Sequence, residues 1–239
     1  DRFPLLDSAA ETLLDVDDAV RAAALPFRKT LPVRTLAWVS DIGDQPQMRL
    51  LSGAMLAAGL ARGDPRMIRA GARMLLAHEA ATLLKNMIKR RVDRTRPKAA
   101  RRREEREPRP GTKRDWESTS FPSGHSAGGL AVARAFAAEY PEHRAAAHAG
   151  AAAVALAQLP RCTHYPSDVA AGLAVGAVAE ALVGIGWRTG ERVLDRALQP
   201  SPAESGSTAA TLLSDARLST NGNEVAVPQA ASGSAGAPA

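Results

Sequence analysis

Cysteine and aromatic residues are scarce in this chain. The sole cysteine among its 239 residues, Cys162, excludes an internal disulfide framework and a cysteine-based zinc site. Aromatic residues make up 4% of the sequence, whereas alanine and leucine, which favour helices, are abundant. The 19 glycines and 16 prolines are close to average usage, which excludes a collagen and a wholly disordered chain. The composition predicts an all-α fold with helices packed around a core.

Long uncharged apolar runs are also lacking. No stretch reaches the run of about 18 apolar residues that by itself identifies a transmembrane helix, although residues 50–61, 145–160 and 169–187 carry very little charge. The first residues lack the basic region, apolar core and small-residue cleavage site of a secretory signal peptide. The mean hydropathy of −0.18 is low for an integral membrane protein. These features of the sequence therefore do not by themselves indicate membrane attachment.

Positive charge is concentrated in one block of the chain. The formal net charge is +6, but residues 89–114 hold thirteen Lys or Arg and four Asp or Glu, a local charge of +9, which leaves the rest at −3. A domain that grips nucleic acid spreads its cations over a face and interleaves aromatic residues for stacking, and this block does neither. We interpret the block as a solvated loop, with an anionic membrane surface as the next interpretation. No nucleic-acid partner is expected.

Prolines and glycines divide the chain into a bundle of about six helices and a tail. The apolar patterns predict helices at 7–25, 50–61, 66–92, 123–139, 144–159 and 166–187, and a short helix running into a turn at 35–47. The expected organisation is an N-terminal amphipathic helix and linker at 1–32, a helical domain at 33–190 with a charged loop at 98–119, and a low-complexity, disordered tail at 191–239. The candidate catalytic and binding residues then fall at helix ends.

Lys89 and Arg96 form the first cluster of candidate binding residues. The two cations are seven residues apart, which places them on nearly the same face of a helix, where they can converge on one anion. Taken alone, a basic helix end before Pro97, favoured by the helix dipole, explains them better. The pair becomes a candidate phosphate site only in combination with other residues.

The second cluster is Pro122-Ser123-Gly124-His125, which opens a predicted helix. Proline suits the first turn, glycine allows a ligand to approach the backbone, and free N–H groups at a helix start bind anions. The motif predicts an anion site at Ser123 and Gly124 with His125 beside it.

The third cluster runs from His164 to Asp168. Pro166 is expected to be the first helical residue, so Asp168 falls in the first turn, where the helix dipole keeps a carboxylate ionised. A carboxylate that holds one imidazole nitrogen fixes the tautomer and leaves the other nitrogen free as nucleophile or base. A helix-capping aspartate beside an incidental surface histidine is an equally good explanation of this cluster alone.

Taken together, the three clusters resemble the type 2 phosphatidic acid phosphatase superfamily, which also contains bacterial acid phosphatases and vanadium haloperoxidases. Its first motif, Lys, six residues, Arg-Pro, is similar to Lys89, Arg96 and Pro97. Its second motif, Pro-Ser-Gly-His, matches residues 122–125 in full. The resemblance covers about residues 35–187 and implies a helical fold.

The third motif of the family departs from this sequence. The family pattern is Ser-Arg, five residues, His, three residues, Asp, and it is matched here at His164 and Asp168 only. The Ser-Arg pair would fall on Ala157 and Gln158, and an arginine appears instead at Arg161. We hypothesise that Arg161 replaces the family arginine, with Gln158 as the alternative.

The resemblance implies a phosphatase mechanism through a phosphohistidine. His164, oriented by Asp168, would attack phosphorus, and His125 would protonate the leaving alcohol and then activate water. The phosphate oxygens would be held by Lys89, Arg96, Arg161 and the N–H groups near Ser123 and Gly124. No metal or other cofactor is expected, because side-chain cations supply the charge, and vanadate is expected to inhibit by mimicking the transition state.

The substrate and location follow from the low-charge helices, which match the membrane-embedded members of the family in position. The leading hypothesis is a membrane-associated phosphatase of a lipid or isoprenoid phosphate in a bacterial inner membrane. A soluble acid phosphatase of broad specificity, a vanadate-dependent haloperoxidase and a non-catalytic scaffold are the alternatives. Phosphatidate, phosphatidylglycerol phosphate, undecaprenyl pyrophosphate and sphingoid phosphates all present the same terminal group, so the choice among them stays open, as does the oligomeric state.

Overall fold

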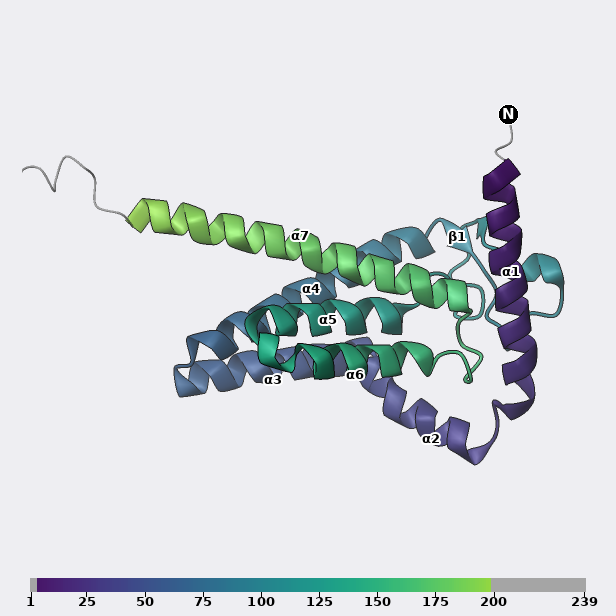
Figure 1. Cartoon of the computed structure of the whole chain (residues 1–239), viewed down its shortest axis with the longest axis horizontal. Helices are drawn as coiled ribbons and strands as arrows, with labels where there is room; N and C mark the ends of the chain where they lie inside the picture. The colour runs from purple at the N-terminus through teal and green to yellow at the C-terminus, as the bar shows by residue number, and fades with distance from the viewer. Residues whose placement is uncertain (1–3, 199–239) are drawn as a thin grey trace, which may run out of the picture. The chain divides into compact units, whose positions relative to one another are not determined.

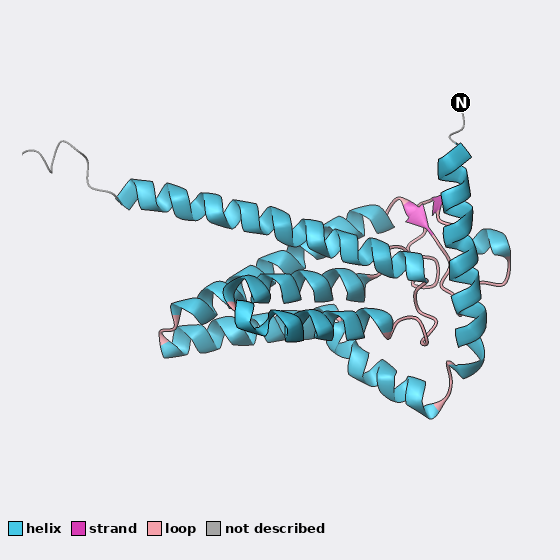
Figure 2. Cartoon of the chain, viewed as in Figure 1, coloured by secondary structure: helices cyan, strands magenta, loops and turns pink. Residues whose placement is uncertain are grey.

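Helices account for nearly all of the regular structure in residues 4–198, the part of the chain that the computed structural model describes (Figures 1 and 2). The helices are α1 (Pro4–Ala24), α2 (Leu31–Ser40), α3 (Gln45–Arg62), α4 (Pro65–Lys89), α5 (Gly124–Glu139), α6 (Arg144–Leu156) and α7 (Pro166–Leu198). Two short strands, β1 (Val92–Asp93) and β2 (Arg109–Pro110), pair antiparallel between α4 and α5. The predicted all-α fold is confirmed.

The chain divides into two units, residues 1–189 and 190–239. Of the second unit, the structure describes residues 190–198, the last turns of α7. The last helix therefore continues eleven residues past the predicted end at Trp187. The predicted tail lies, from residue 199 onward, outside the described residues.

The boundary between α3 and α4 shows how local sequence fixes the helix ends. Gly63 ends α3 with a φ of 63°, a left-handed conformation that glycine adopts without strain. The Asp64 side chain then accepts hydrogen bonds from the N–H groups of Arg66 and Met67, at 2.9 and 3.2 Å, and caps α4. Pro65 suits the first turn. Three consecutive residues thus reverse the chain direction.

Helices α3, α4, α5 and α6 pack side by side in chain order (Figure 1). Their contacts are rich in alanine, which lets helix axes approach closely. Met48 and Met74 fill the remaining gaps in this core. Its small buried residues are Ala77, Ala81, Ala127, Ala131, Ala135 and Ala179.

The start of α7 packs tightly against the start of α5. A Cβ added at Gly172 or Gly176 would collide with the carbonyl oxygens of Ser123 and Ala127 respectively. The close approach lets the Ser123 N–H donate to the Asp168 carbonyl oxygen at 3.0 Å. Two helix starts that are more than 40 residues apart in sequence are thereby locked together.

The charged segment 98–119 is a loop, as expected, but it is anchored to the protein. It contains β2 and a 3-10 turn at Arg103–Glu105. Helix α1 holds the start of the segment, because the Arg21 side chain donates to the carbonyl oxygens of Pro97 and Ala100, at 2.8 and 2.6 Å. The acidic face of α1 also pairs with the loop, with Asp18 lying 3.3 Å from Arg106.

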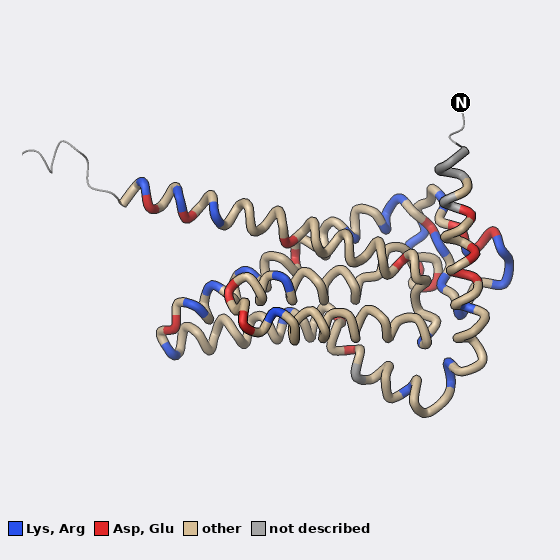
Figure 3. Tube along the Cα trace, in the orientation of Figure 1, with Lys and Arg blue, Asp and Glu red and all other residues tan. Residues whose placement is uncertain are grey.

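Within the described residues, one helix, Pro166–Leu198, is long and apolar enough to cross a membrane, and its most apolar 18-residue window has a mean hydropathy of 1.9. The low-charge segment 50–61 lies in α3, and the segment 145–160 lies in α6 up to Leu156; neither helix meets the same criterion. Figure 3 shows long uncharged stretches along these helices, with charged residues gathered toward helix ends and loops.

Candidate active site

A polar pocket of about 380 Å³ lies where the end of α4, the start of α5 and the loop after α6 meet. Of the eight residues predicted to form the site, Ser123 and Asp168 lie behind this pocket. The six that line it are Lys89, Arg96, Gly124, His125, Arg161 and His164. Sequence positions up to 75 residues apart therefore come together as the motifs predict.

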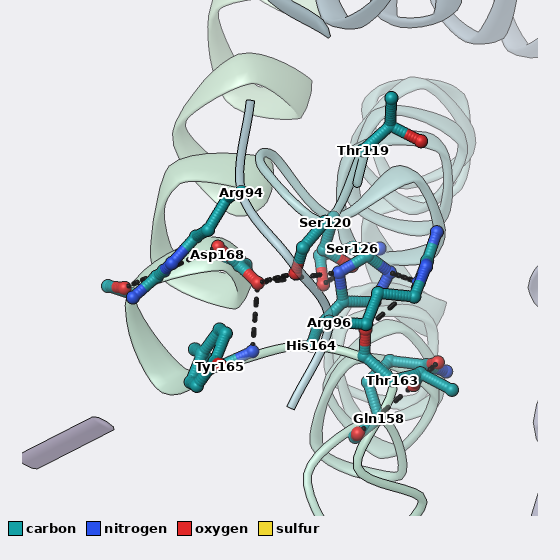
Figure 4. A network of polar contacts seen from close by, with 12 residues as sticks. Arg94, Arg96, Thr119, Ser120, Ser126, Gln158, Thr163, His164, Tyr165 and Asp168 are labelled. Atoms are coloured by element: carbon teal, nitrogen blue, oxygen red, sulfur yellow. Dashed lines mark hydrogen bonds and ion pairs between the residues drawn. The ribbon is translucent and has the colours of Figure 1, made fainter. Parts of the chain in front are cut away.

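His164 lies in the loop before α7 and is 4% exposed. Its Nε2 atom is 3.2 Å from Nη1 of Arg96, and its Nδ1 atom is 3.6 Å from Oδ2 of Asp168 (Figure 4). The second distance is too long for a hydrogen bond, so Asp168 faces the ring as a charge partner. Burial lowers the pKa of His164 to about 4, although Asp168 opposes the shift. The imidazole is therefore neutral at physiological pH, as a nucleophile must be.

A buried network fixes the carboxylate of Asp168 (Figure 4). Its Oδ1 atom accepts from Nη1 of Arg94 at 2.6 Å, and its Oδ2 atom accepts from the Ser120 hydroxyl and from the Tyr165 N–H at 2.9 Å. The other arm of Arg94 donates to Asp17 of α1 at 2.6 Å. All these charges are compensated by partners, as burial requires. Asp168 thus has no freedom to turn away from His164.

Arg94 and Asp17 were not predicted as part of the site. Arg94 belongs to the basic block interpreted as a solvated loop, yet it is 1% exposed, and its guanidinium lies 4.0 Å from the centre of the Tyr165 ring. The interpretation of the block as solvated is therefore wrong for Arg94, and Arg96, which was predicted to bind phosphate, is also buried at 6% exposure. Both guanidinium groups are buried because acidic or carbonyl groups in the interior pair with them.

Arg96 is held in place by its surroundings. Its Nε donates to the Trp116 carbonyl oxygen at 2.8 Å, its Nη1 donates to the Thr163 carbonyl oxygen at 2.9 Å, and its guanidinium stacks 3.9 Å from the Trp116 ring centre. Burial lowers the pKa of Arg96 to about 10, which leaves it protonated at neutral pH. The Lys89 ammonium donates to the Thr119 carbonyl oxygen. Burial, with the charges of Arg96 and Lys85, lowers the pKa of Lys89 to about 7. Arg96 is therefore the permanent cation close to His164, and Lys89 gains its full charge when an anion lies beside it.

Gln158 and Arg161 both line the pocket but differ in their partners. Gln158 is fully buried; its amide donates to the Val154 carbonyl oxygen at 3.0 Å and accepts from the Thr163 hydroxyl at 2.9 Å. Arg161 lies 2.9 Å from Asp41 and donates to the Ser40 hydroxyl at 2.5 Å. The Gln158 side chain thus stabilises the loop, whereas Arg161 places a positive charge at the pocket wall.

The backbone donors at the start of α5 differ from the expectation at one position. The Ser123 N–H is used by the Asp168 carbonyl oxygen, and the Ser123 hydroxyl accepts from the Ser126 N–H and hydroxyl. Gly124 and His125 occupy the first turn of α5, where N–H groups have no intrahelical partner. These two N–H groups, rather than that of Ser123, are available to an anion.

His125 lies beside two carboxylates that were not predicted. Its Nε2 atom is 2.9 Å from Oδ1 of Asp44. Asp41, Asp44 and His125 have ligand atoms within 4.8 Å of one another and form the one group of this kind found in the described residues. Both carboxylates already have a partner, since Asp41 pairs with Arg161. The sequence offered no signal for them, because they lie in the turn between α2 and α3, far from every motif.

Known proteins resemble this chain in sequence and in fold. The sequence profile of the PAP2 superfamily matches residues 70–189, half of the chain, and this range includes all eight predicted site residues. No curated protein matches the sequence. Among solved structures, the chain is similar to the first transmembrane PAP2 type phosphatidylglycerolphosphate phosphatase from Bacillus subtilis, with 20% identity over 83% of this chain and 90% of that chain and a TM-score of 0.51. That similarity concerns the fold, whereas the profile match identifies the chain as belonging to the PAP2 superfamily.

Proposed function

We propose that the chain is a metal-independent phosphatase that hydrolyses a phosphomonoester or pyrophosphate of a lipid or isoprenoid through a phosphohistidine on His164. One observation carries the proposal: a buried, neutral histidine faces a cationic pocket, and that pocket adjoins an apolar one. The first feature suits phosphoryl transfer, and the second suits a hydrocarbon tail.

The chemistry follows from the side chains that line the polar pocket. Lys89, Arg96 and Arg161 hold the non-bridging oxygens of the phosphoryl group, where charge develops during transfer. The lone pair of the His164 imidazole forms the bond to phosphorus while the bond to the leaving oxygen breaks. His125 gives its proton to that oxygen, then accepts one from the water that attacks the phosphohistidine. Burial lowers the pKa of His125, and the Asp44 carboxylate opposes that shift and so favours the protonated form. Phosphate leaves, and both histidines return to their starting states.

The apolar pocket, about 550 Å³, is lined by side chains of α2 to α6. The turn at Gly43 separates it from the polar pocket: Gly43 packs between His125 and Val154, and Val154 lines the apolar side. The tail of a lipid substrate placed there would leave its head group next to His125. That is where the leaving oxygen must lie if His125 is the proton donor.

Filling the apolar pocket should impair lipid substrates selectively. Gly150 lines this pocket, and a Cβ added there meets nothing within 4 Å, so Gly150→Leu introduces no clash at Cβ and is expected to occupy part of the space. We expect kcat/KM for a long-chain lipid phosphate to fall about tenfold or more, a loss of about 1.4 kcal/mol or more of binding. The value for p-nitrophenyl phosphate should stay unchanged.

Gly53→Leu is the matched control for this variant. Gly53 is also a helical glycine with open space around it, but it does not line the apolar pocket. Equal losses for both variants, or equal losses for both substrates, would show that the tail binds elsewhere.

The pH dependence of kcat/KM should reflect the burial of His164. The pKa of His164 is lowered from 6.5 to about 4, so the neutral nucleophile persists as the pH falls and is lost only near pH 4. Because kcat/KM reports the free enzyme, its acidic limb should lie near pH 4 when the protonation of the substrate is corrected for. An acidic limb near pH 6.5 would indicate a solvated nucleophile.

We also propose that the protein resides in a membrane, namely a bacterial inner membrane. Helix α7 is long and apolar enough to span it, and the large apolar side chains on the outer faces of α4 and α7 are more than half exposed, more than a soluble monomer normally shows. These side chains are Leu76, Leu83, Met87, Val178, Leu182 and Ile185. Retention in the membrane fraction after alkaline carbonate extraction is expected; complete release would contradict the proposal.

A substrate panel in detergent tests the proposed function as a whole. Phosphate release is expected from at least one lipid or isoprenoid phosphate, with a chelator having no effect and vanadate inhibiting competitively. Loss of activity on chelation would direct attention to the group of Asp41, Asp44 and His125. Bromide oxidation with vanadate and peroxide, in the absence of phosphate release, would identify a haloperoxidase instead.

A further inference from the structure

Lys85 is a buried cation that the three motifs do not include. It lies one helical turn before Lys89 on the same face of α4, lines the polar pocket and is 6% exposed. Within residues 4–198, no carboxylate forms an ion pair with its ammonium group and no oxygen accepts a hydrogen bond from it. Most of the side chain is buried, and the residue lines the polar pocket. A largely buried cation without a partner among these residues favours an anionic ligand.

The position of the ammonium group indicates where that partner would lie. A Cβ added at Gly124 would come within 3.2 Å of the Lys85 Cδ and 3.5 Å of its Nζ, so the side chain runs along the start of α5. The free N–H groups of that helix start carry a partial positive charge. Two positive groups therefore converge on one corner of the pocket, as in sites that bind phosphate.

We propose that Lys85 is a further substrate-binding cation, which holds one non-bridging phosphoryl oxygen together with the first N–H groups of α5. This inference rests on the proposed phosphatase function and deepens it. Lys85 would also supply positive charge that the pocket otherwise lacks. Gln158 is neutral where the third motif has arginine, and Arg161 is paired with Asp41. Lys85 alone among the lining cations of the pocket has neither a carboxylate nor a carbonyl partner in the described structure, so its ammonium group is free to bind substrate. Burial lowers the pKa of Lys85 below its usual value, and a bound phosphoryl anion would oppose that shift.

The replacement of Lys85 by methionine separates a ligand-binding role from a structural one. Lys85→Met removes a buried charge and keeps the volume, so the unfolding temperature of the free protein should rise or stay unchanged. Its affinity for vanadate should fall about 10- to 100-fold, the loss expected for one hydrogen bond to a charged group. Lys85→Arg should retain affinity within a few fold, and Lys85→Gln provides a second neutral variant.

Lys29→Met is the control, because Lys29 is exposed and outside the pocket. Vanadate binding is measured by calorimetry, alongside hydrolysis of the best substrate from the panel. Wild-type vanadate affinity in Lys85→Met and Lys85→Gln, or a drop equal to that of Lys29→Met, would overturn the inference. If the wild type hydrolyses no phosphate ester but loses vanadate affinity on substitution of Lys85, the anion site stands and the phosphatase function fails.

Discussion

Replacing His164 with alanine is expected to abolish phosphate release from every substrate. The imidazole is the nucleophile of the proposed reaction, and Arg96 holds its Nε2 side at 3.2 Å while Asp168 faces Nδ1. Without it no covalent intermediate forms, and the remaining cations can only bind the substrate. Vanadate affinity should therefore fall much less than turnover. The measurement is phosphate release over at least four orders of magnitude in rate.

His125→Ala should behave differently. A slow first turnover should survive with p-nitrophenyl phosphate, because p-nitrophenolate leaves without a proton, whereas an alkyl ester should stay intact. His148→Ala, on α6 and outside the pocket, is the control for loss of a histidine. Equal residual activity of the His164 and His125 variants toward both leaving groups would contradict these separate roles.

Arg161→Ala should lower turnover by about 10²- to 10³-fold, as loss of one transition-state donor does. The guanidinium lies on the pocket wall, 2.9 Å from Asp41, and its fork suits two phosphoryl oxygens. Arg161→Lys should recover only part of the activity, because the fork geometry is lost. Phosphate release measured at saturating substrate separates this effect from weaker binding.

Two variants test the alternatives to Arg161. Ser40→Ala removes the hydroxyl that Arg161 contacts but leaves its charge, so turnover should change little. Gln158→Ala should act on stability, since the Gln158 amide bonds only to the protein. Near wild-type turnover in Arg161→Ala, combined with an inactive but folded Gln158→Ala, would assign the third-motif role to Gln158.

The helix boundaries could be predicted where residues that end one helix are followed directly by residues that cap the next. Gly63, Asp64 and Pro65 indicate one end and one start, and the structure places both there. The start of α3 was missed because Asp44-Gln45-Pro46 was taken for a turn after a helix. Proline in the first turn begins a helix as readily as it ends one, and only the following apolar residues decide. The sequence signal is therefore ambiguous at that position.

The site could be predicted as far as its motifs extend. Six of the eight predicted site residues line one pocket because each cluster falls at a helix end, and the ends meet. Lys85, Arg94 and Asp17 could not be predicted, because their roles depend on contacts between distant segments. In the sequence, Arg94 is one of many cations in a basic block. In the structure it binds Asp17 of α1 and Asp168 of α7, which are 77 and 74 residues away in the chain. The position of Lys85, four residues before Lys89 on the same helix face, was the one available signal.

Trapping the covalent intermediate tests the central claim most directly. The enzyme is mixed with p-nitrophenyl phosphate labelled in its phosphoryl group, quenched within milliseconds under alkaline conditions, digested and analysed by mass spectrometry. A phosphoryl group that is stable to alkali, labile to acid and located on His164 is the predicted result, with a larger amount in His125→Ala because water is no longer activated. Label on another residue, or label that persists in His164→Ala, would contradict the account.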